Sequence, residues 1–128
     1  MLSHYFPQLL PLAHTERNFL YYVMSYHEGA TLQARLDQGA HFSIADAVGI
    51  GIRLAKGLGA LHRLNILHRD IKPANLHLGT DEKLRILDLG VAQNGGAAPV
   101  ETEGAPGTPS FMAPELLSGA TASVTSDL

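Results

Sequence analysis

Residues 68–75, which read His-Arg-Asp-Ile-Lys-Pro-Ala-Asn, constrain the fold of this chain more than any other segment. Two short apolar runs follow, at residues 76–78 and 84–87, and the connector between them is rich in turn-forming residues. This pattern predicts a β-hairpin. The hairpin begins directly after residues 68–75 and ends at Asp88, so it brings polar groups from both of its ends close together.

The side chains gathered in this way suit phosphoryl transfer, in which a protein mainly positions the reactants and neutralises charge. Asp70 can accept or orient the proton of an attacking hydroxyl group, and Lys72 can offset the charge of the moving phosphoryl group. Asn75 and Asp88 offer the hard oxygen ligands that Mg²⁺ prefers. The structural alternative is a buried salt-bridge cluster in an α+β domain.

Several segments together resemble a eukaryotic-type serine/threonine protein kinase of bacterial appearance. Besides residues 68–75 and Asp-Leu-Gly at residues 88–90, Val-Met-Ser-Tyr-His-Glu-Gly at residues 23–29 resembles the hinge, and Gly-Thr-Pro-Ser-Phe-Met-Ala-Pro-Glu at residues 107–115 resembles the end of the activation segment. Ser-Asp-Leu at residues 126–128 resembles the start of the central helix of the large lobe. The resemblance implies an α+β fold, an incomplete protein kinase-like fold with a mainly α large lobe and a remnant small-lobe β-hairpin.

The resemblance also divides the chain. Residues 1–26 correspond to the last two strands of the small lobe, residues 27–30 to the hinge, and residues 31–128 to a partial large lobe. The sequence contains no G-x-G-x-x-G loop and no V-A-I-K-type strand with its lysine. We therefore expect a fragment that shows little or no activity alone, because the ATP phosphates lose most of their positioning.

The reaction implied by the resemblance is transfer of the ATP γ-phosphate to Ser/Thr hydroxyls of proteins, with Mg²⁺. Asp70 is then the catalytic carboxylate, Lys72 acts beside it, and Thr108 contacts both and positions the substrate residue. Asn75 and Asp88 bind the metal ion. Lys72 and Asn75 also face the nucleotide.

The resemblance places the adenine pocket at the hinge. Met24 corresponds to the gatekeeper, and the backbones of Ser25 and His27 correspond to the groups that bond adenine. His77 stands where the family normally has an apolar residue beneath the adenine ring. An imidazole can stack under a purine, but desolvation of its nitrogens opposes binding.

Regulation and support involve four further residues. Arg69 precedes the catalytic carboxylate, as in kinases switched on by activation-loop phosphorylation, and a guanidinium can hold a phosphate bidentately. Thr102 is the only hydroxyl residue within residues 91–107, and the alternative is that it is an ordinary solvated loop residue. We expect His68 to be a buried residue that hydrogen-bonds backbone near the metal-binding Asp, and Asp127 to accept hydrogen bonds from backbone near His68.

Other patterns predict the remaining elements. Apolar and aromatic runs at residues 8–13 and 18–26, separated by polar residues 14–17, indicate a β-hairpin. Residues 31–38 show a short helical pattern ending at a glycine. Residues 93–110 lack periodicity and indicate a long loop.

A long helix is predicted over residues 44–61, whose apolar positions keep a period of 3.6 residues. Ser43, with Asp46 three residues on, forms a variant of the capping box at its start. A shorter helix follows Pro114. We expect part of the apolar stripe of the long helix to stay uncovered. Whether its glycines mark a close helix crossing stays open for Gly49, Gly51, Gly57 and Gly59.

The amino-acid composition argues against several classes of protein. Hydrophobic residues make up 45% and charged residues 16%, which suits a globular chain. The net charge of −3 without a basic stripe argues against nucleic-acid binding. No apolar run reaches the roughly 18 residues of a membrane span, and the absence of cysteine excludes disulfides. Without a recognisable signal peptide we expect a cytoplasmic protein, and the oligomeric state is unknown.

Two other functions stay open. A small-molecule kinase of the aminoglycoside-phosphotransferase type shares the Asp-x-x-x-x-Asn logic, but Lys72-Pro73 and residues 107–115 disfavour it. The second function is that of a pseudokinase-like fragment that binds a partner without catalysis, although the intact motif residues argue against a loss of catalytic function.

Overall fold

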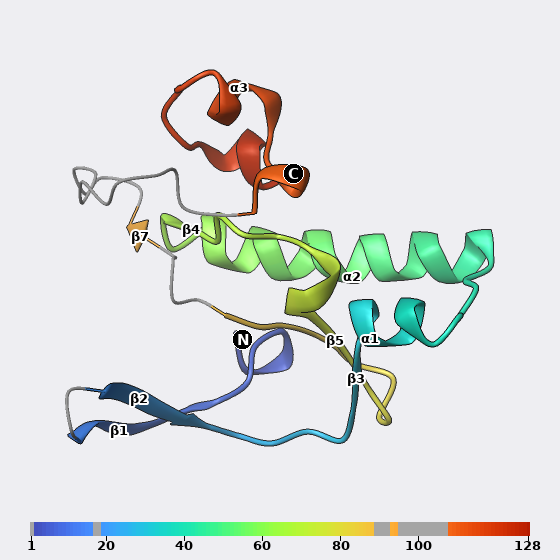
Figure 1. Ribbon diagram of the computed structural model, residues 1–128, viewed down its shortest axis with the longest axis horizontal. Helices are drawn as coiled ribbons and strands as arrows, with labels where there is room; N and C mark the ends of the chain where they lie inside the picture. The colour runs from blue at the N-terminus through green and yellow to red at the C-terminus, as the bar shows by residue number, and fades with distance from the viewer. Residues whose placement is uncertain (1, 17–18, 89–92, 95–107) are drawn as a thin grey trace.

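The computed structural model describes residues 2–16, 19–88, 93–94 and 108–128. Helix α2 crosses the middle of the molecule, with the hairpin β1–β2 and strands β3 and β5 on one side and the C-terminal segment on the other (Figure 1). In chain order the elements are η1 (Leu2–His4), β1 (Leu9–Glu16), β2 (Phe19–Met24), β3 (Gly29–Thr31), α1 (Leu32–Asp37), α2 (Ile44–His62), β4 (Ile66–Leu67), η2 (Pro73–Asn75), β5 (Leu76–Gly79), β6 (Leu84–Ile86), β7 (Gln93–Asn94), η4 (Pro109–Phe111), α3 (Pro114–Leu117) and η5 (Val124–Asp127), where η denotes a 3-10 helix.

The first predicted hairpin is confirmed as the antiparallel pair β1–β2. The predicted polar turn at residues 14–17 is too long, because β1 continues to Glu16, which pairs with Phe19. Backbone pairing does not require apolar side chains, so a polar stretch can extend a strand that an apolar run has started. The second strand also ends earlier than predicted, at Met24.

The second predicted hairpin is confirmed as β5–β6, and β3 adds to its free edge to give a three-stranded antiparallel sheet of order β3-β5-β6. Strand β6 ends at Ile86, one residue before the predicted limit. A two-stranded ladder between β4 and β7 was not predicted. Its strands have two residues each, which is too short for any periodicity to appear in the sequence.

The helices begin where their capping residues predict. The Ser43 hydroxyl accepts a hydrogen bond from the backbone N–H of Asp46 and donates to the Asp46 carboxylate at 2.6 Å, which confirms Ser43 as the N-cap of α2. In a capping box the carboxylate would accept from the backbone N–H of Ser43 instead, so only half of the predicted box forms among the described residues. Helix α1 starts after Thr31, whose hydroxyl accepts from the N–H of Ala34. Helix α3 has Pro114 in its first turn. Within the described residues no helix is long and apolar enough to cross a membrane.

The core lies between the C-terminal half of α2, the β5–β6 hairpin and the N-terminal segment. It is built from Phe6, Leu32, Leu58, Leu61, Leu76, Leu78, Leu84 and Ile86. Gly57 packs closely against strand β6 rather than against another helix, since a Cβ there would stand 2.8 Å from the Ile86 side chain. The other three glycines of α2 have no such neighbour. Close packing therefore accounts for one of the four glycines, and among the described residues no second helix crosses α2 at any of them.

The N-terminal half of α2 leaves its apolar stripe uncovered, as expected. Ile44, Val48 and Ile52 are 86%, 56% and 52% exposed, whereas Leu58 and Leu61 on the same stripe are buried. The helix is therefore stabilised by tertiary packing mainly along its second half, which lies next to the segments that carry the candidate site.

Candidate active site

Residues 68–70, which follow β4, are held in place by the buried imidazole of His68. His68 is fully buried, and its Nδ1 accepts a hydrogen bond from the backbone N–H of Asp70 at 3.2 Å. Because Nδ1 is the acceptor, Nε2 carries the proton and donates to the carbonyl of Leu87 at 2.8 Å. The expected structural role of His68 is confirmed: this side chain joins residues 68–70 to the end of the β5–β6 hairpin.

A second buried group holds the same segment from the C-terminal side. The Asp127 carboxylate accepts from the backbone N–H groups of His68 and Arg69, each at 2.8 Å, and lies 2.9 Å from Nε2 of His62. The predicted contact between Asp127 and the backbone at His68 is confirmed. Arg69 has a φ of +73°, a conformation that non-glycine residues rarely adopt, so these hydrogen bonds hold the chain in a strained turn directly before Asp70.

The Asp70 carboxylate is the centre of a polar network. Its Oδ1 accepts from both the backbone N–H and the hydroxyl of Thr108, each at 3.0 Å. Its Oδ2 lies 3.4 Å from Nζ of Lys72 and accepts from Nδ2 of Asn75 at 3.2 Å. The Lys72 ammonium also donates to the Thr108 hydroxyl. The expected contacts of Thr108 with Asp70 and Lys72 are therefore present, and Asn75, which the sequence assigned to the metal ion and the nucleotide, also contacts Asp70.

Burial of Asp70 raises the pKa of its carboxyl group, but the Thr108 hydroxyl and the Lys72 charge outweigh burial and hold that pKa below its ordinary value. Asp70 therefore stays ionised across the neutral pH range. A carboxylate of low basicity orients a hydroxyl group by accepting its hydrogen bond and takes the proton only as the hydroxyl oxygen loses its electron density.

The hairpin brings the chain around Asp88 to Asn75, because the backbone N–H of Leu87 donates to the carbonyl of Asn75 at 2.8 Å. The Nδ2 group of Asn75 also donates to the carbonyl of Asp70 at 2.8 Å, which leaves its Oδ1 oxygen for a cation. Asp88 is exposed and has a φ of +61°. An amide oxygen and a carboxylate fit Mg²⁺, which keeps several waters and uses few protein ligands. Among the described residues no cluster of three or more His, Asp or Glu could hold a metal ion.

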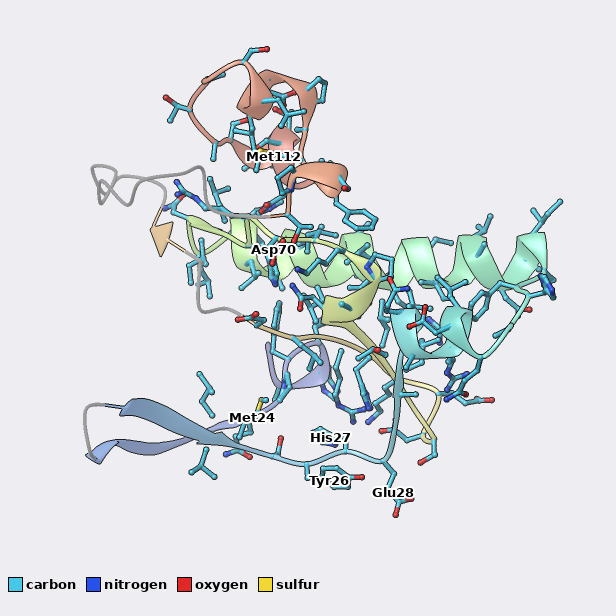
Figure 2. All side chains as sticks on the ribbon, viewed as in Figure 1. Met24, Tyr26, His27, Glu28, Asp70 and Met112 are labelled. Carbon is cyan, nitrogen blue, oxygen red and sulfur yellow. The ribbon has the colours of Figure 1, made fainter. Side chains whose placement is uncertain are left out.

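The four residues assigned to the adenine site line one small pocket of about 170 Å³. Figure 2 shows Met24 at the end of β2 and Tyr26 and His27 on the chain that follows it, with Asp70 farther into the molecule. Tyr26 is 87% exposed. The Ser25 hydroxyl lies 2.9 Å from Nε2 of His27 and also accepts from the backbone N–H of Gln8 at 2.9 Å, so the segment is tied to the residue just before β1.

His77 forms part of the wall of this pocket and brings a polar ring into it. Its Nδ1 is buried and has no hydrogen-bond partner among the described residues. Burial lowers the pKa of the His77 imidazole, and the charges of Arg85 and His27 lower it further. The ring is therefore neutral at physiological pH. The free-energy cost of burying it in the pocket is then that of an unpaired polar atom rather than that of a buried charge.

Sequence reasoning missed four residues of the pocket wall: Pro7, Tyr26, Arg85 and Leu87. Arg85 is buried and forms a two-point ion pair with Asp81, at 2.7 and 3.1 Å. Its position follows from the register of β5–β6, in which Arg85 pairs with His77. Directly opposed residues project to the same face of a sheet, so the predicted hairpin already contained the signal for Arg85.

Of the two residues in the regulatory hypothesis, the structure describes Arg69 but not Thr102. Arg69 is half-buried, and its Nε has no partner among the described residues. Thr102 and the rest of the segment between β7 and residue 108 lie outside the described residues, as do residues 89–92.

Comparisons with known proteins agree with this geometry. The family model described as "Protein kinase domain" matches residues 8–128. Serine/threonine-protein kinase PknK of Mycobacterium tuberculosis (strain ATCC 25618 / H37Rv) is 35% identical over 106 residues, which cover 83% of this chain and 10% of that protein. Serine/threonine-protein kinase stk11 of Xenopus laevis is 40% identical over 115 residues (84% of this chain, 26% of that protein), and serine/threonine-protein kinase H2 of Homo sapiens is 39% identical over 121 residues (91% and 31%). The chain thus spans about a third or less of these relatives.

Proposed function

The chain belongs to the protein kinase family, and we propose that it supplies the catalytic residues of an ATP-dependent protein serine/threonine kinase. The observation that carries this proposal is the convergence of Lys72, Asn75 and Thr108 on the Asp70 carboxylate. Such a set of groups positions a hydroxyl group and neutralises phosphate charge, which are the two tasks of a phosphoryl-transfer site.

In the proposed reaction the oxygen of a substrate Ser or Thr hydroxyl forms a bond to the γ-phosphorus, and the bond from that phosphorus to the β–γ bridging oxygen breaks. Phosphorylated protein and ADP are the products. Asp70 holds the hydroxyl by accepting its hydrogen bond and receives its proton as the new bond forms. Lys72 lies beside Asp70 and stabilises the charge on the transferred group. Thr108, which bonds to both side chains, sets the distance between them.

Asn75 and Asp88 are the proposed ligands of Mg²⁺, which when bound neutralises the nucleotide phosphates. For the base, we propose the pocket formed by Met24, Ser25, His27 and His77, with the backbones of Ser25 and His27 as its polar groups.

The same proposal divides the chain into residues 1–26 as the last part of a small lobe, residues 27–30 as a hinge, and residues 31–128 as a partial large lobe. Support comes from the separate β1–β2 sheet, which forms no ladder with β3-β5-β6, and from the pocket that lies between the two sheets. Protein rather than a small molecule is the proposed acceptor, because Thr108 comes from the segment 107–115 that resembles a peptide-binding platform.

The test is phosphotransfer by the full-length protein that carries this domain. Asp70→Asn and Asp88→Ala should each lower the rate of ³²P transfer from ATP to a Ser/Thr protein substrate by about 10²-fold or more, since each removes a group acting on the transferred phosphate. Asp37→Asn, on the exposed end of α1, is the matched control and should keep the wild-type rate. Near-normal rates in both site variants would refute the assignment, and an inactive wild type that still binds nucleotide would favour the non-catalytic alternative.

A further inference from the structure

A second hollow lies away from the candidate active site, between α1, the first half of α2 and the turn that joins β5 to β6. We call it the α1–α2 groove. Its volume is about 620 Å³, within the range of about 300–1,000 Å³ of known ligand sites. None of the residues of the Asp70 network or of the adenine pocket lines it. In Figure 1 these elements lie at one end of the molecule, and α3 lies beyond the other half of α2.

Two guanidinium groups are held in place along the groove. Nη2 of Arg35 donates to the carbonyl of Leu78 at 3.2 Å, and Nη1 of Arg53 donates to the carbonyl of Glu82 at 2.6 Å. In the described part of the chain neither arginine has a carboxylate within ion-pair distance. Both guanidinium groups therefore keep further N–H donors for an external acceptor, and their anchoring lowers the entropy that binding would cost.

The floor of the groove is apolar. Phe42 and Ile50 are half-buried and pack against the core, and Leu78 is a buried member of it. A hollow that combines such a floor with fixed cations accommodates an apolar side chain next to an anionic one, because each gains a contact that water does not provide.

The two acids that also line the groove do not cancel its positive charge. The Asp46 carboxylate accepts the Ser43 hydroxyl at the start of α2, and the Asp46 and Glu82 side chains are exposed, whereas both arginines are half-buried. Solvent screens exposed charges more strongly than partly buried ones. Arg35 and Arg53 are therefore the less screened charges of the groove.

We propose that the α1–α2 groove docks an extended peptide segment of a partner protein in which an apolar side chain is flanked by carboxylates. The apolar side chain rests on Phe42 and Ile50, and the carboxylates take the unused donors of Arg35 and Arg53. A docked partner is thus held at a distance from the site around Asp70, and this binding needs no phosphate transfer.

The proposal is tested by fluorescence anisotropy with the 128-residue chain and a labelled peptide, Gly-Asp-Leu-Asp-Phe-Asp-Gly. Arg35→Gln should weaken binding at least tenfold, and affinity should fall as salt rises from 50 to 200 mM. Arg63→Gln, an exposed arginine on the last turn side of α2, is the matched control and should leave the affinity unchanged. In the bound state the amide NMR signals of Gly79 and Thr80 should shift.

Three results would overturn the proposal: equal binding of the peptide with Asn in place of each Asp, binding that Arg35→Gln leaves intact, or equally tight binding of citrate, which would make the groove a site for small anions. If Arg35→Gln alters the thermal melt, Arg53→Gln replaces it as the diagnostic variant, with the same tenfold loss expected. Failure of this experiment leaves the phosphotransfer proposal untouched, because no residue of the Asp70 network takes part.

Discussion

Removal of the Asp127 carboxylate should destabilise the fold more than any other single side-chain change near the candidate site. Asp127 is buried and accepts hydrogen bonds from two backbone N–H groups, of His68 and Arg69, and from the His62 ring. Asp127→Ala leaves these donors without a partner. Each unsatisfied buried donor costs about 1–3 kcal/mol, so the two backbone groups alone account for about 2–6 kcal/mol. Against a typical total of about 5–15 kcal/mol, we expect a loss of about 3–5 kcal/mol.

Urea unfolding of the 128-residue chain, followed by circular dichroism, measures this loss as a shift of the midpoint at constant slope. Asp127→Asn retains one carbonyl oxygen that can accept from one of the two N–H groups, so it should lie between wild type and Asp127→Ala. Asp37→Ala removes an exposed carboxylate whose one hydrogen bond is to Gln33, and it should stay within about 0.5 kcal/mol of wild type. An Asp127→Ala midpoint equal to that of the Asp37→Ala control would refute the reasoning.

Three further predictions follow from other groups. The folded-state pKa of Asp70 is depressed below its ordinary value of 3.8, so the ionised carboxylate stabilises the fold above that pH. This stability is lost as the pH falls through the lower, folded-state pKa. Asp70→Asn should therefore flatten the curve of unfolding free energy against pH below about pH 4. His77→Leu removes the buried Nδ1 atom that has no partner and should raise the free energy of unfolding by about 1 kcal/mol, measured in urea; unchanged or lower stability would mean that the ring nitrogen is satisfied in solution. The exposed stripe at Ile44, Val48 and Ile52 should make the isolated chain associate, and Val48→Glu should reduce the apparent mass in analytical ultracentrifugation at about 100 μM; a wild-type chain that sediments as a monomer would contradict this.

The parts of the fold that the sequence predicted are those set by neighbours along the chain. The capping pair Ser43 and Asp46 fixes the start of α2 within a single turn. The β5–β6 hairpin needs only a short turn between two apolar runs. In both cases the residues that decide the structure are near in sequence, so their pattern can be read without knowledge of the rest of the chain.

The parts that escaped prediction depend on distant residues. The backbone N–H of Ile86 donates to the carbonyl of Tyr5 at 2.7 Å, so the N-terminal segment lies along β6, and nothing in either local sequence announces that pairing. The pairing of β4 with β7 is of the same kind. The α1–α2 groove also depends on such contacts, since Arg35 and Leu78, which share a hydrogen bond, stand 43 residues apart. A backbone N–H or C=O group bonds to whichever partner the folded core brings next to it, and the periodicity of the sequence does not indicate which partner that is.

The site itself combines both kinds of information. Residues 68–75 carry the proposed catalytic groups, yet the conformation of this segment depends on Asp127, which lies 59 residues from His68 and 58 from Arg69. The positive φ of Arg69 is unfavourable for an isolated loop by about 1–3 kcal/mol, so residues 68–75 alone would relax and turn the Asp70 carboxylate away from Lys72 and Thr108. The hydrogen bonds to Asp127 are large enough to offset that strain. It follows that an intact motif does not guarantee an assembled site: a chain with the same string but without an acceptor at the position of Asp127 would keep the residues of a phosphotransferase and lose their arrangement.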